Sequence, residues 1–199
     1  MATQQTLVSP QEYLELEHKA SFKSEYRNGL IVPMPGASPE HVYIQSDLHI
    51  EIGICLKGQS CKVYGSDLKV RTKTRYSYPD LTIACEKPAY DYDPNGNAVL
   101  LNPTLIVEVL SPSTEGYDRG DKFAAYRELK SFGEYLLISQ TQPLVDHYIK
   151  QTDNSWKFLT YKGLDANVKL ETVSCTLALR EIYKQVNFEN GQDQERSNV

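Results

Sequence analysis

The stretch Leu105–Leu110 limits most strongly what this chain can fold into. Its residues, Leu-Ile-Val-Glu-Val-Leu, are apolar apart from one glutamate, and Pro103 and Pro112 stand close to its two ends. A short apolar run between turn residues is typical of a strand that is buried on both faces. Glu108 lies inside that run, where a bare carboxylate is costly to bury. We therefore expect a cation, a partner base or a metal ion beside Glu108.

The rest of the chain mixes helical and strand patterns. Capping residues and helical spacing predict helices over 10–19, 38–56, 118–130 and 177–183. Strands are predicted over 61–64, 68–70, 78–85, 134–139, 144–149, 156–161 and 168–170. Asn28-Gly29 predicts the tight turn of a hairpin over 23–32, and the polar stretch 87–98 is predicted to be a loop. This order predicts an α+β fold, with a mixed central β-sheet flanked by helices and an additional antiparallel hairpin.

The length of 199 residues suits one domain, which we place at 1–186, followed by a polar tail over 187–199 that we expect to be disordered. The net charge of −5 means that any nucleic-acid contact must use a local basic patch or bound cations. No apolar run approaches membrane-spanning length, so no membrane association is expected. The four cysteines, at 55, 61, 85 and 175, form no CxxC pair, which predicts reduced thiols and a cytoplasmic location.

Three charged side chains can be placed together at one end of the predicted sheet. Asp80 begins a strand directly after Pro79, Glu108 lies in the next long strand, and Lys122 falls in the helix that follows. If the two strands are neighbours, both carboxylates can converge, and a cation of the magnesium type would satisfy them. A lysine beside such a metal can hold a water nucleophile or neutralise charge that develops on a phosphate. Asp80 and Lys122 also have ordinary interpretations, because Asp after Pro is common in turns and a Lys beside the apolar stripe of a helix usually extends into water.

The sequence also resembles a known family. The segments "YPDLTIAC", "LIVEVLSPST" and "DRGDKFAAYRELKSFGEYLLI" look like the Uma-two family, which is assigned to the restriction-endonuclease-like PD-(D/E)XK superfamily. The resemblance runs from about Tyr13 to Tyr183 and implies a metal-dependent phosphodiesterase core in which Asp80 and Glu108 bind magnesium. One departure matters, because the superfamily's usual lysine lies two residues after the glutamate, where this chain has Leu110. Lys122 would be a migrated replacement.

Two further residues are secondary candidates. Glu25, in the predicted hairpin, resembles an acidic position of the family and could contact the metal or its water, although it could instead pair with Lys23 or Arg27 across the hairpin. His41 begins the long predicted helix and could meet substrate, although a role at the helix end or in solvent is the simpler expectation.

Four basic residues alternate with other residues before Asp80. They are Lys69, Arg71, Lys73 and Arg75, and in an extended segment all four side chains would point to one face. A basic ridge that leads to a metal site would suit a phosphate backbone. The alternative is an exposed hairpin that is kept in solution by its charge.

These observations favour a Mg- (or Mn-) dependent endonuclease that acts on DNA, with a homodimer as the preferred assembly. A second hypothesis is a nucleic-acid-binding or regulatory module of the same fold that has no turnover, which the leucine at position 110 favours. A third is a structural domain in which Glu108 and Lys122 form a buried ion pair and no metal binds; on that hypothesis methionine at position 122 is tolerated.

Overall fold

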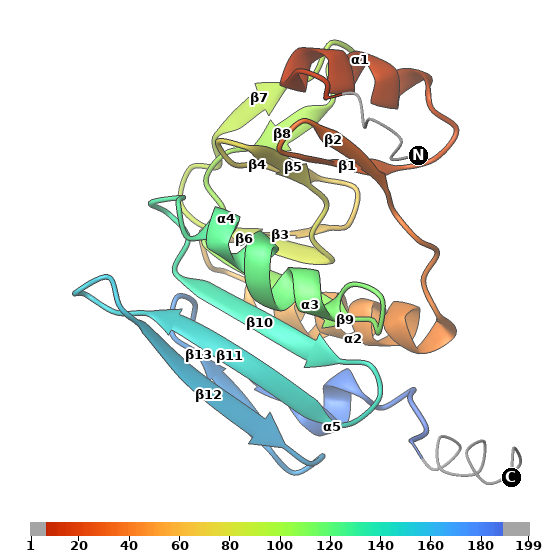
Figure 1. Ribbon diagram of the computed structural model, residues 1–199. Coiled ribbons are helices and arrows are strands. Elements are labelled where there is room, and N and C mark those ends of the chain that lie inside the picture. The colour runs from red at the N-terminus through yellow and green to blue at the C-terminus, as the bar shows by residue number, and fades with distance from the viewer. Residues whose placement is uncertain (1–6, 189–199) are drawn as a thin grey trace, which may run out of the picture.

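Two six-stranded sheets lie one above the other in the computed structural model, which describes residues 7–188 (Figure 1). The order in the first sheet is β2 (Leu30–Pro33), β1 (Ser24–Arg27), β5 (Arg75–Ser77), β4 (Lys69–Arg71), β8 (Ala98–Leu100) and β7 (Tyr90–Tyr92). The order in the second is β12 (Trp156–Lys162), β11 (Leu144–Lys150), β10 (Glu134–Ser139), β9 (Leu105–Leu110), β6 (Leu81–Ala84) and β3 (Lys62–Gly65). A separate hairpin pairs β13 (Asn167–Leu170) with β14 (Cys175–Ala178).

Strand β9 is at the centre of the second sheet, and all six of its residues are buried, as its sequence predicts. It runs parallel to β10 on one side and antiparallel to β6 on the other, so the sheet is mixed. The α+β class and the mixed central sheet are therefore confirmed. The additional hairpin, β1–β2, turns at Asn28 and Gly29, which both have positive φ. It does not stand alone but forms one edge of the first six-stranded sheet.

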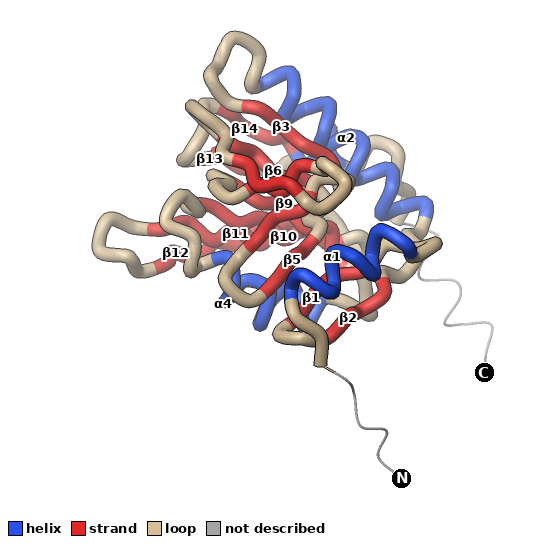
Figure 2. The backbone as a smooth tube through the Cα atoms, turned by 90° about the horizontal axis from the view of Figure 1, so that it is seen from above, coloured by secondary structure: helices blue, strands red, loops and turns tan. Residues whose placement is uncertain are grey.

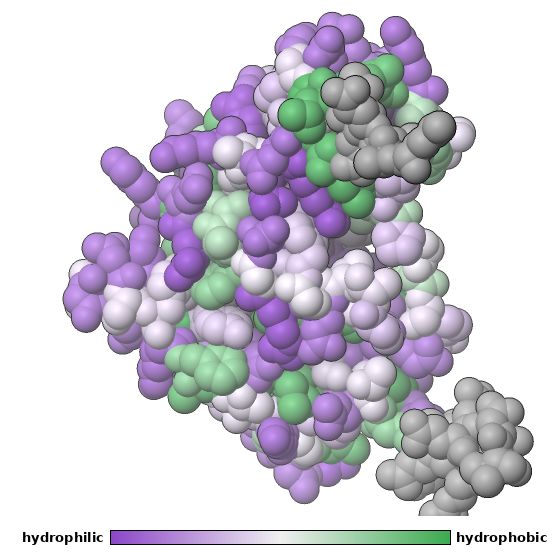
Figure 3. Space-filling model, viewed as in Figure 1, coloured by the Kyte–Doolittle hydropathy of each residue, from purple (hydrophilic) through white to green (hydrophobic). Residues whose placement is uncertain are grey.

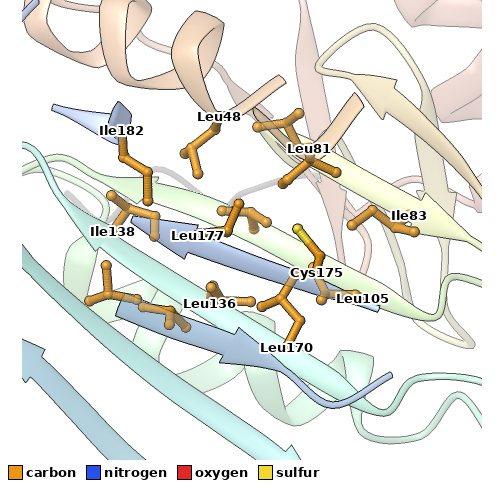
Figure 4. Close-up of a cluster of buried hydrophobic side chains, with 14 of the residues drawn as sticks. Leu48, Leu81, Ile83, Leu105, Leu136, Ile138, Leu170, Cys175, Leu177 and Ile182 are labelled. Atoms are coloured by element: carbon orange, nitrogen blue, oxygen red, sulfur yellow. The ribbon is translucent and has the colours of Figure 1, made fainter. Parts of the chain in front are cut away.

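The alternation of side chains along β9 separates two hydrophobic cores. Leu105, Val107 and Val109 face a cluster built with α2 (Pro39–Cys55), β13, β14 and α5 (Leu179–Ile182). Figure 4 shows side chains from these elements meeting those of the sheet. Ile106 and Leu110 face a second, aromatic-rich cluster beneath α4 (Phe123–Tyr126). Glu108 shares this second face, so its carboxylate points toward the helical segment and away from α2.

Both long predicted helices in the first part of the chain have the expected caps. α1 (Pro10–Lys19) has a capping box between Ser9 and Glu12. At the start of α2, the Ser38 hydroxyl accepts a hydrogen bond from the backbone N–H of His41 at 3.2 Å. Proline stands at the first turn of each, where its missing N–H is not needed.

Three predicted boundaries are wrong. The helix predicted over 118–130 consists of α3 (Glu115–Tyr117), a π-helical turn η1 (Asp118–Lys122) and α4, and it ends at Tyr126. The closing helix is limited to α5 because residues 175–178 pair with β13 as a strand. The predicted loop over 87–98 contains β7 and the start of β8, which pair with each other; Tyr90-Asp91-Tyr92 alternates over only three residues between Pro88 and Pro94, too short a run to predict a strand.

The prediction of reduced thiols is also wrong. Cys55 at the end of α2 is bonded to Cys175 in β14, and Cys61 is bonded to Cys85 where β3 and β6 run side by side. The partners are 120 and 24 residues apart in sequence, and only the tertiary fold brings them together.

The ends of the chain and its surface complete the fold. Phe188 packs on the Tyr183 ring, with 5.3 Å between ring centroids, and residues 189–199 of the predicted tail lie outside the described residues. None of the helices between residues 7 and 188 has the length and apolar character that crossing a bilayer requires. The face in Figure 3 is mainly hydrophilic, with hydrophobic side chains in small separate groups.

Candidate active site

Asp80 and Glu108 come from neighbouring antiparallel strands. The register pairs Leu81 of β6 with Val107 of β9, and one further step places Asp80 opposite Glu108. Asp80 Oδ2 accepts a hydrogen bond from Val109 N at 2.7 Å, which ties the end of β6 to β9. Both carboxylates line one cavity of about 300 Å³.

Helix α2 supplies the groups that hold Asp80 from the other side. His41 Nε2 lies 2.9 Å from Asp80 Oδ1, and Gln45 Nε2 donates to the Asp80 carbonyl oxygen at 3.1 Å. His41 and Gln45 are four residues apart, so they lie on the same face of the helix. Because Pro39 and the Ser38 cap fix where α2 begins, they also fix where these two side chains meet Asp80.

Lys122 reaches Glu108 from the π-helical turn. Its Nζ atom lies 2.8 Å from Glu108 Oε1, 3.3 Å from Asp118 Oδ1 and 3.5 Å from Glu25 Oε1. Tyr126 OH also donates to Glu108 Oε1, at 3.3 Å. The Lys122 side chain is only 6% exposed, so the ammonium is a buried charge surrounded by carboxylates.

Burial and charge together shift the protonation of this cluster. Burial raises the pKa of Glu108 well above its ordinary value; the Lys122 ammonium opposes this shift, and the charges of Asp118 and Asp80 add to it. Burial likewise raises the pKa of Asp118, against the effect of Lys122. For Lys122, burial acts to lower the pKa, but the attraction of Glu108, Glu25 and Asp118 outweighs it and the pKa is raised. Lys122 is therefore a permanent cation in the cavity.

Glu25 belongs to the same cavity and is buried in β1. Its Oε1 atom accepts from Tyr78 N at 3.2 Å, and its Oε2 atom accepts from the Arg27 guanidinium at 2.9 Å. The guanidinium carbon of Arg27 in turn lies over the Tyr117 ring, 3.5 Å from its centroid. The expected pairing of Glu25 with Arg27 is thus present, but it takes place inside the cavity wall.

Five predicted site residues therefore line one cavity: Asp80, Glu108, Lys122, Glu25 and His41. Two of their neighbours in the cavity wall were not predicted, Gln45 and Asp118. Asp118 could have been found from helical spacing, because it stands four residues before Lys122. Arg27 was expected only as a partner of Glu25 in the hairpin, since a cation in a hairpin is usually solvated, and its place in the cavity wall was not predicted.

The expected basic ridge does not form. Thr72 Oγ1 accepts from Arg75 N at 3.1 Å, and Thr72 N donates to the Arg75 carbonyl at 3.0 Å, so residues 72–75 form a tight turn between β4 and β5. Lys69 is buried and bonded to Glu17 at 2.6 Å and Asp93 at 3.1 Å.

The other three members of the expected ridge differ in exposure. Arg75 is buried and donates to Tyr117 OH at 3.1 Å. Arg71 is partly exposed and paired with Asp91, and Lys73 is exposed.

The donor set of the cavity fits a hard divalent cation. Four carboxylates and two permanent cations line it, which leaves a formal charge of −2 when His41 is neutral. Within residues 7–188 no three His, Cys, Asp or Glu side chains form a full set of metal ligands. That is compatible with magnesium, which is usually held by one or two carboxylates and keeps several waters. Asp80 and Glu108 are the pair that would hold it.

Comparison with known proteins gives consistent results. The model of the family Uma2, described as "Putative restriction endonuclease", matches residues 10–182. Two relatives from Synechocystis sp. (strain ATCC 27184 / PCC 6803 / Kazusa) are each described as an uncharacterized protein. One is 36% identical and covers 91% of this chain and 94% of its own length; the other is 33% identical, with 82% and 92% covered.

One solved structure is also similar. It is the crystal structure of "a putative nuclease belonging to DUF820" from Anabaena variabilis ATCC 29413, which superposes with a TM-score of 0.69 at 19% identity. The superposition covers 86% of this chain and 97% of that one. At this identity the likeness shows that the two chains share a fold.

Proposed function

Because the chain belongs to the Uma2 family, we propose that it is a metal-dependent endonuclease that hydrolyses phosphodiester bonds in DNA. The single observation that supports this most strongly is the meeting of Asp80, Glu108 and Lys122 in one cavity. Two of these residues are acids on adjacent strands, and the amine of the third lies 2.8 Å from one of them.

In this proposal each residue has a separate role. Asp80 and Glu108 hold Mg²⁺ or Mn²⁺, which when bound would polarise a phosphoryl oxygen and make a water more acidic. Lys122 keeps its proton throughout and places a fixed positive charge where negative charge grows on the phosphate. His41 and Gln45 orient Asp80, and Glu25 holds Lys122 and Arg27 in place.

The substrate assignment follows from chemistry and charge. A bound dication would bring the formal charge of the cavity from −2 to 0 and would offer a coordination position to a phosphodiester oxygen, so the net charge of −5 on the whole chain does not exclude a nucleic-acid substrate. Lys73 and Arg71 are the members of the alternating basic set that are exposed enough to reach a DNA backbone beyond the cavity. We expect Lys73→Glu to weaken DNA binding and to reduce its salt dependence.

One observation favours the second hypothesis, a module that binds without cleaving. Leu110 stands where the superfamily usually has its lysine, and here its side chain is buried in the aromatic-rich core. A lysine at 110 could not sit in that core without a partner. The position of Lys122 supports cleavage instead, because it brings an amine to the same carboxylate from another element.

Nicking of supercoiled plasmid in Mg²⁺ or Mn²⁺ tests the proposal. We expect the wild type to nick, and Asp80→Asn and Glu108→Gln to lose at least about 100-fold, since each removes a metal ligand without changing the shape of the side chain. Asp165→Asn is the matched control, because the Asp165 side chain is 93% exposed, pairs with Arg180 and lies outside the cavity. Binding of DNA without nicking by the wild type would leave the non-cleaving module as the correct function. Equal nicking by Asp80→Asn would exclude the assigned site.

A further inference from the structure

Helix α2 presents apolar side chains on both of its faces. Its inner face is buried by Ile44, Leu48 and Ile52. Its outer face carries four more large apolar residues, of which Val42 is 44% exposed, Tyr43 43%, Ile50 51% and Ile54 65%. These four follow one side of the helix over three turns, and Figure 2 shows α2 along the margin of the molecule. A helix that is apolar all round is normally buried on all sides.

Nothing else in this sequence can cover that face. The segments outside the described range, 1–6 and 189–199, carry only three apolar residues, Met1, Ala2 and Val199. A membrane surface is also a poor partner, because the lysines beside this face are Lys57, just after the end of α2, and Lys62 in the adjoining groove, whereas lipid-binding helices carry several basic residues along one polar face. The remaining candidate is another protein, and the face itself indicates which one.

The outer face is complementary to itself when two copies run antiparallel. A twofold axis at Ile50, the third of the four exposed apolar residues, brings Ile54 opposite the partner's Ser46, so a large side chain meets a small one. Gly53 adds open space, since a Cβ atom there would touch nothing within 4 Å. The same axis brings Tyr43 opposite the partner's Lys57, and Glu40 one turn away from it.

A groove extends this complementarity. It is a shallow depression of about 540 Å³ between the C-terminal half of α2 and β3, lined by Ile50, Ile54, Lys57 and Val63 among others. Val42 and Tyr43 project from the N-terminal half of the same face. An antiparallel pair places each N-terminal half against the other copy's C-terminal half, so Tyr43 of each copy can enter the partner's groove. Strand β3 is at the edge of its sheet and lies beside this contact.

We propose that the outer face of α2, together with the groove beside β3, is the interface of a twofold-symmetric homodimer. The four apolar side chains expose roughly 400 Å² together if each has about 200 Å² when fully exposed. That is about half of the ~800 Å² that each partner buries in a typical stable complex. The groove and β3 must supply the rest, and the dimer should dissociate in the micromolar range. This inference does not depend on the nuclease activity.

Sedimentation equilibrium tests the interface directly. Over about 1 to 500 µM, the range expected for a small interface, the wild type should shift from the monomer to twice that mass. Ile50→Glu should stay monomeric with an unchanged circular dichroism spectrum, since its side chain is half exposed in the monomer. Leu16→Glu is the matched control: Leu16 is 48% exposed on another helix, and its variant should dimerise like the wild type. A wild type that stays monomeric, or an Ile50→Glu variant that still dimerises, would overturn the proposal.

A charge exchange tests the orientation. Lys57→Glu would place a carboxylate near the partner's Glu40 at both ends of the contact and should weaken the dimer roughly tenfold. Adding Glu40→Lys should bring the dissociation constant back to within about threefold of the wild type. If the double variant is no tighter than Lys57→Glu alone, the antiparallel arrangement is wrong.

Discussion

Replacing Lys122 by methionine would remove one ammonium from the midst of three carboxylates. Its distances to Glu108, Asp118 and Glu25 are 2.8, 3.3 and 3.5 Å. With an effective dielectric constant of about 20, each pair attracts by about 5 to 6 kcal/mol before solvation is counted. Desolvation of the buried ions offsets most of that sum, and loss of one partner of a buried pair typically costs about 3 to 5 kcal/mol. We therefore expect Lys122→Met to lower the free energy of unfolding by about 3 to 5 kcal/mol at pH 7.

The loss of stability in Lys122→Met should depend on pH, because it comes from electrostatic interactions with ionised carboxylates. Burial raises the pKa values of Glu108 and Asp118, so these carboxyls take up protons at higher pH than ordinary acids. Once they are neutral they no longer need the ammonium. The destabilisation should therefore be largest at neutral pH and shrink as the pH falls toward 4. Added Mg²⁺ should restore part of the stability, because a dication can take the place of the lost charge.

Thermal and urea unfolding at several pH values measure this cost. For a chain of this length, 3 to 5 kcal/mol corresponds to a fall in Tm of roughly 6 to 20 °C. Lys169→Met is the matched control, because Lys169 is 73% exposed and 3.9 Å from Glu171, and it should change stability by less than about 0.5 kcal/mol. If Lys122→Met is as stable as the wild type at pH 7, the ammonium does not hold the carboxylate cluster together and the reasoning fails.

Two further stability predictions follow from groups outside the cavity. Burial would raise the pKa of Asp93, but hydrogen bonds from Asn97, Lys69 and Asn95 overcome this and lower it to about 2. Asp93 therefore contributes about 2 kcal/mol above pH 4 that is lost as the pH falls to about 2; the stability difference between wild type and Asp93→Ala should shrink by that amount over this window. The disulfides should differ with loop length: removing Cys55–Cys175, which closes a 120-residue loop, should cost about 5 kcal/mol, and removing Cys61–Cys85, 24 residues apart, about 3. Urea unfolding of the two paired Cys→Ser variants checks the order, and a larger loss for the shorter loop would contradict it.

The central strand and its acid could be predicted because their signals are local. An apolar run with one interior carboxylate specifies both a buried strand and the need for a partner, and β9 with Glu108 has both. The position of Asp80 followed from the same logic once the two strands were taken as neighbours, and β6 pairs with β9.

The basic residues were misplaced because alternation alone does not show that a segment stays extended. Thr72 closes a turn through its hydroxyl, which a pattern of every second residue cannot reveal. Lys69 instead forms buried ion pairs with Glu17 and Asp93, which lie in distant parts of the sequence. The disulfides were not predicted either, because the spacing of cysteines in the sequence does not show which ends of helices and strands meet in the fold.

For Lys122, the sequence predicted the neighbourhood of the side chain but not the local structure that positions it. Its place in the segment that follows Glu108 suggested that it could lie beside the two acids, and its amine does reach Glu108. The π-helical turn that aims it there could not be predicted, because helical spacing of apolar residues does not distinguish an α-helical turn from a π-helical one.

Calorimetric titration with Mn²⁺ in the absence of DNA tests the central claim most directly, that Asp80 and Glu108 jointly hold a divalent cation. We expect one site in the wild type, a loss of affinity of at least about tenfold in Asp80→Asn and in Glu108→Gln, and unchanged binding in Asp165→Asn. The double variant should bind more weakly than either single variant or not at all, because it keeps neither charged ligand of the one ion. A wild type that binds no cation, or binding that survives loss of both carboxylates, would contradict the account.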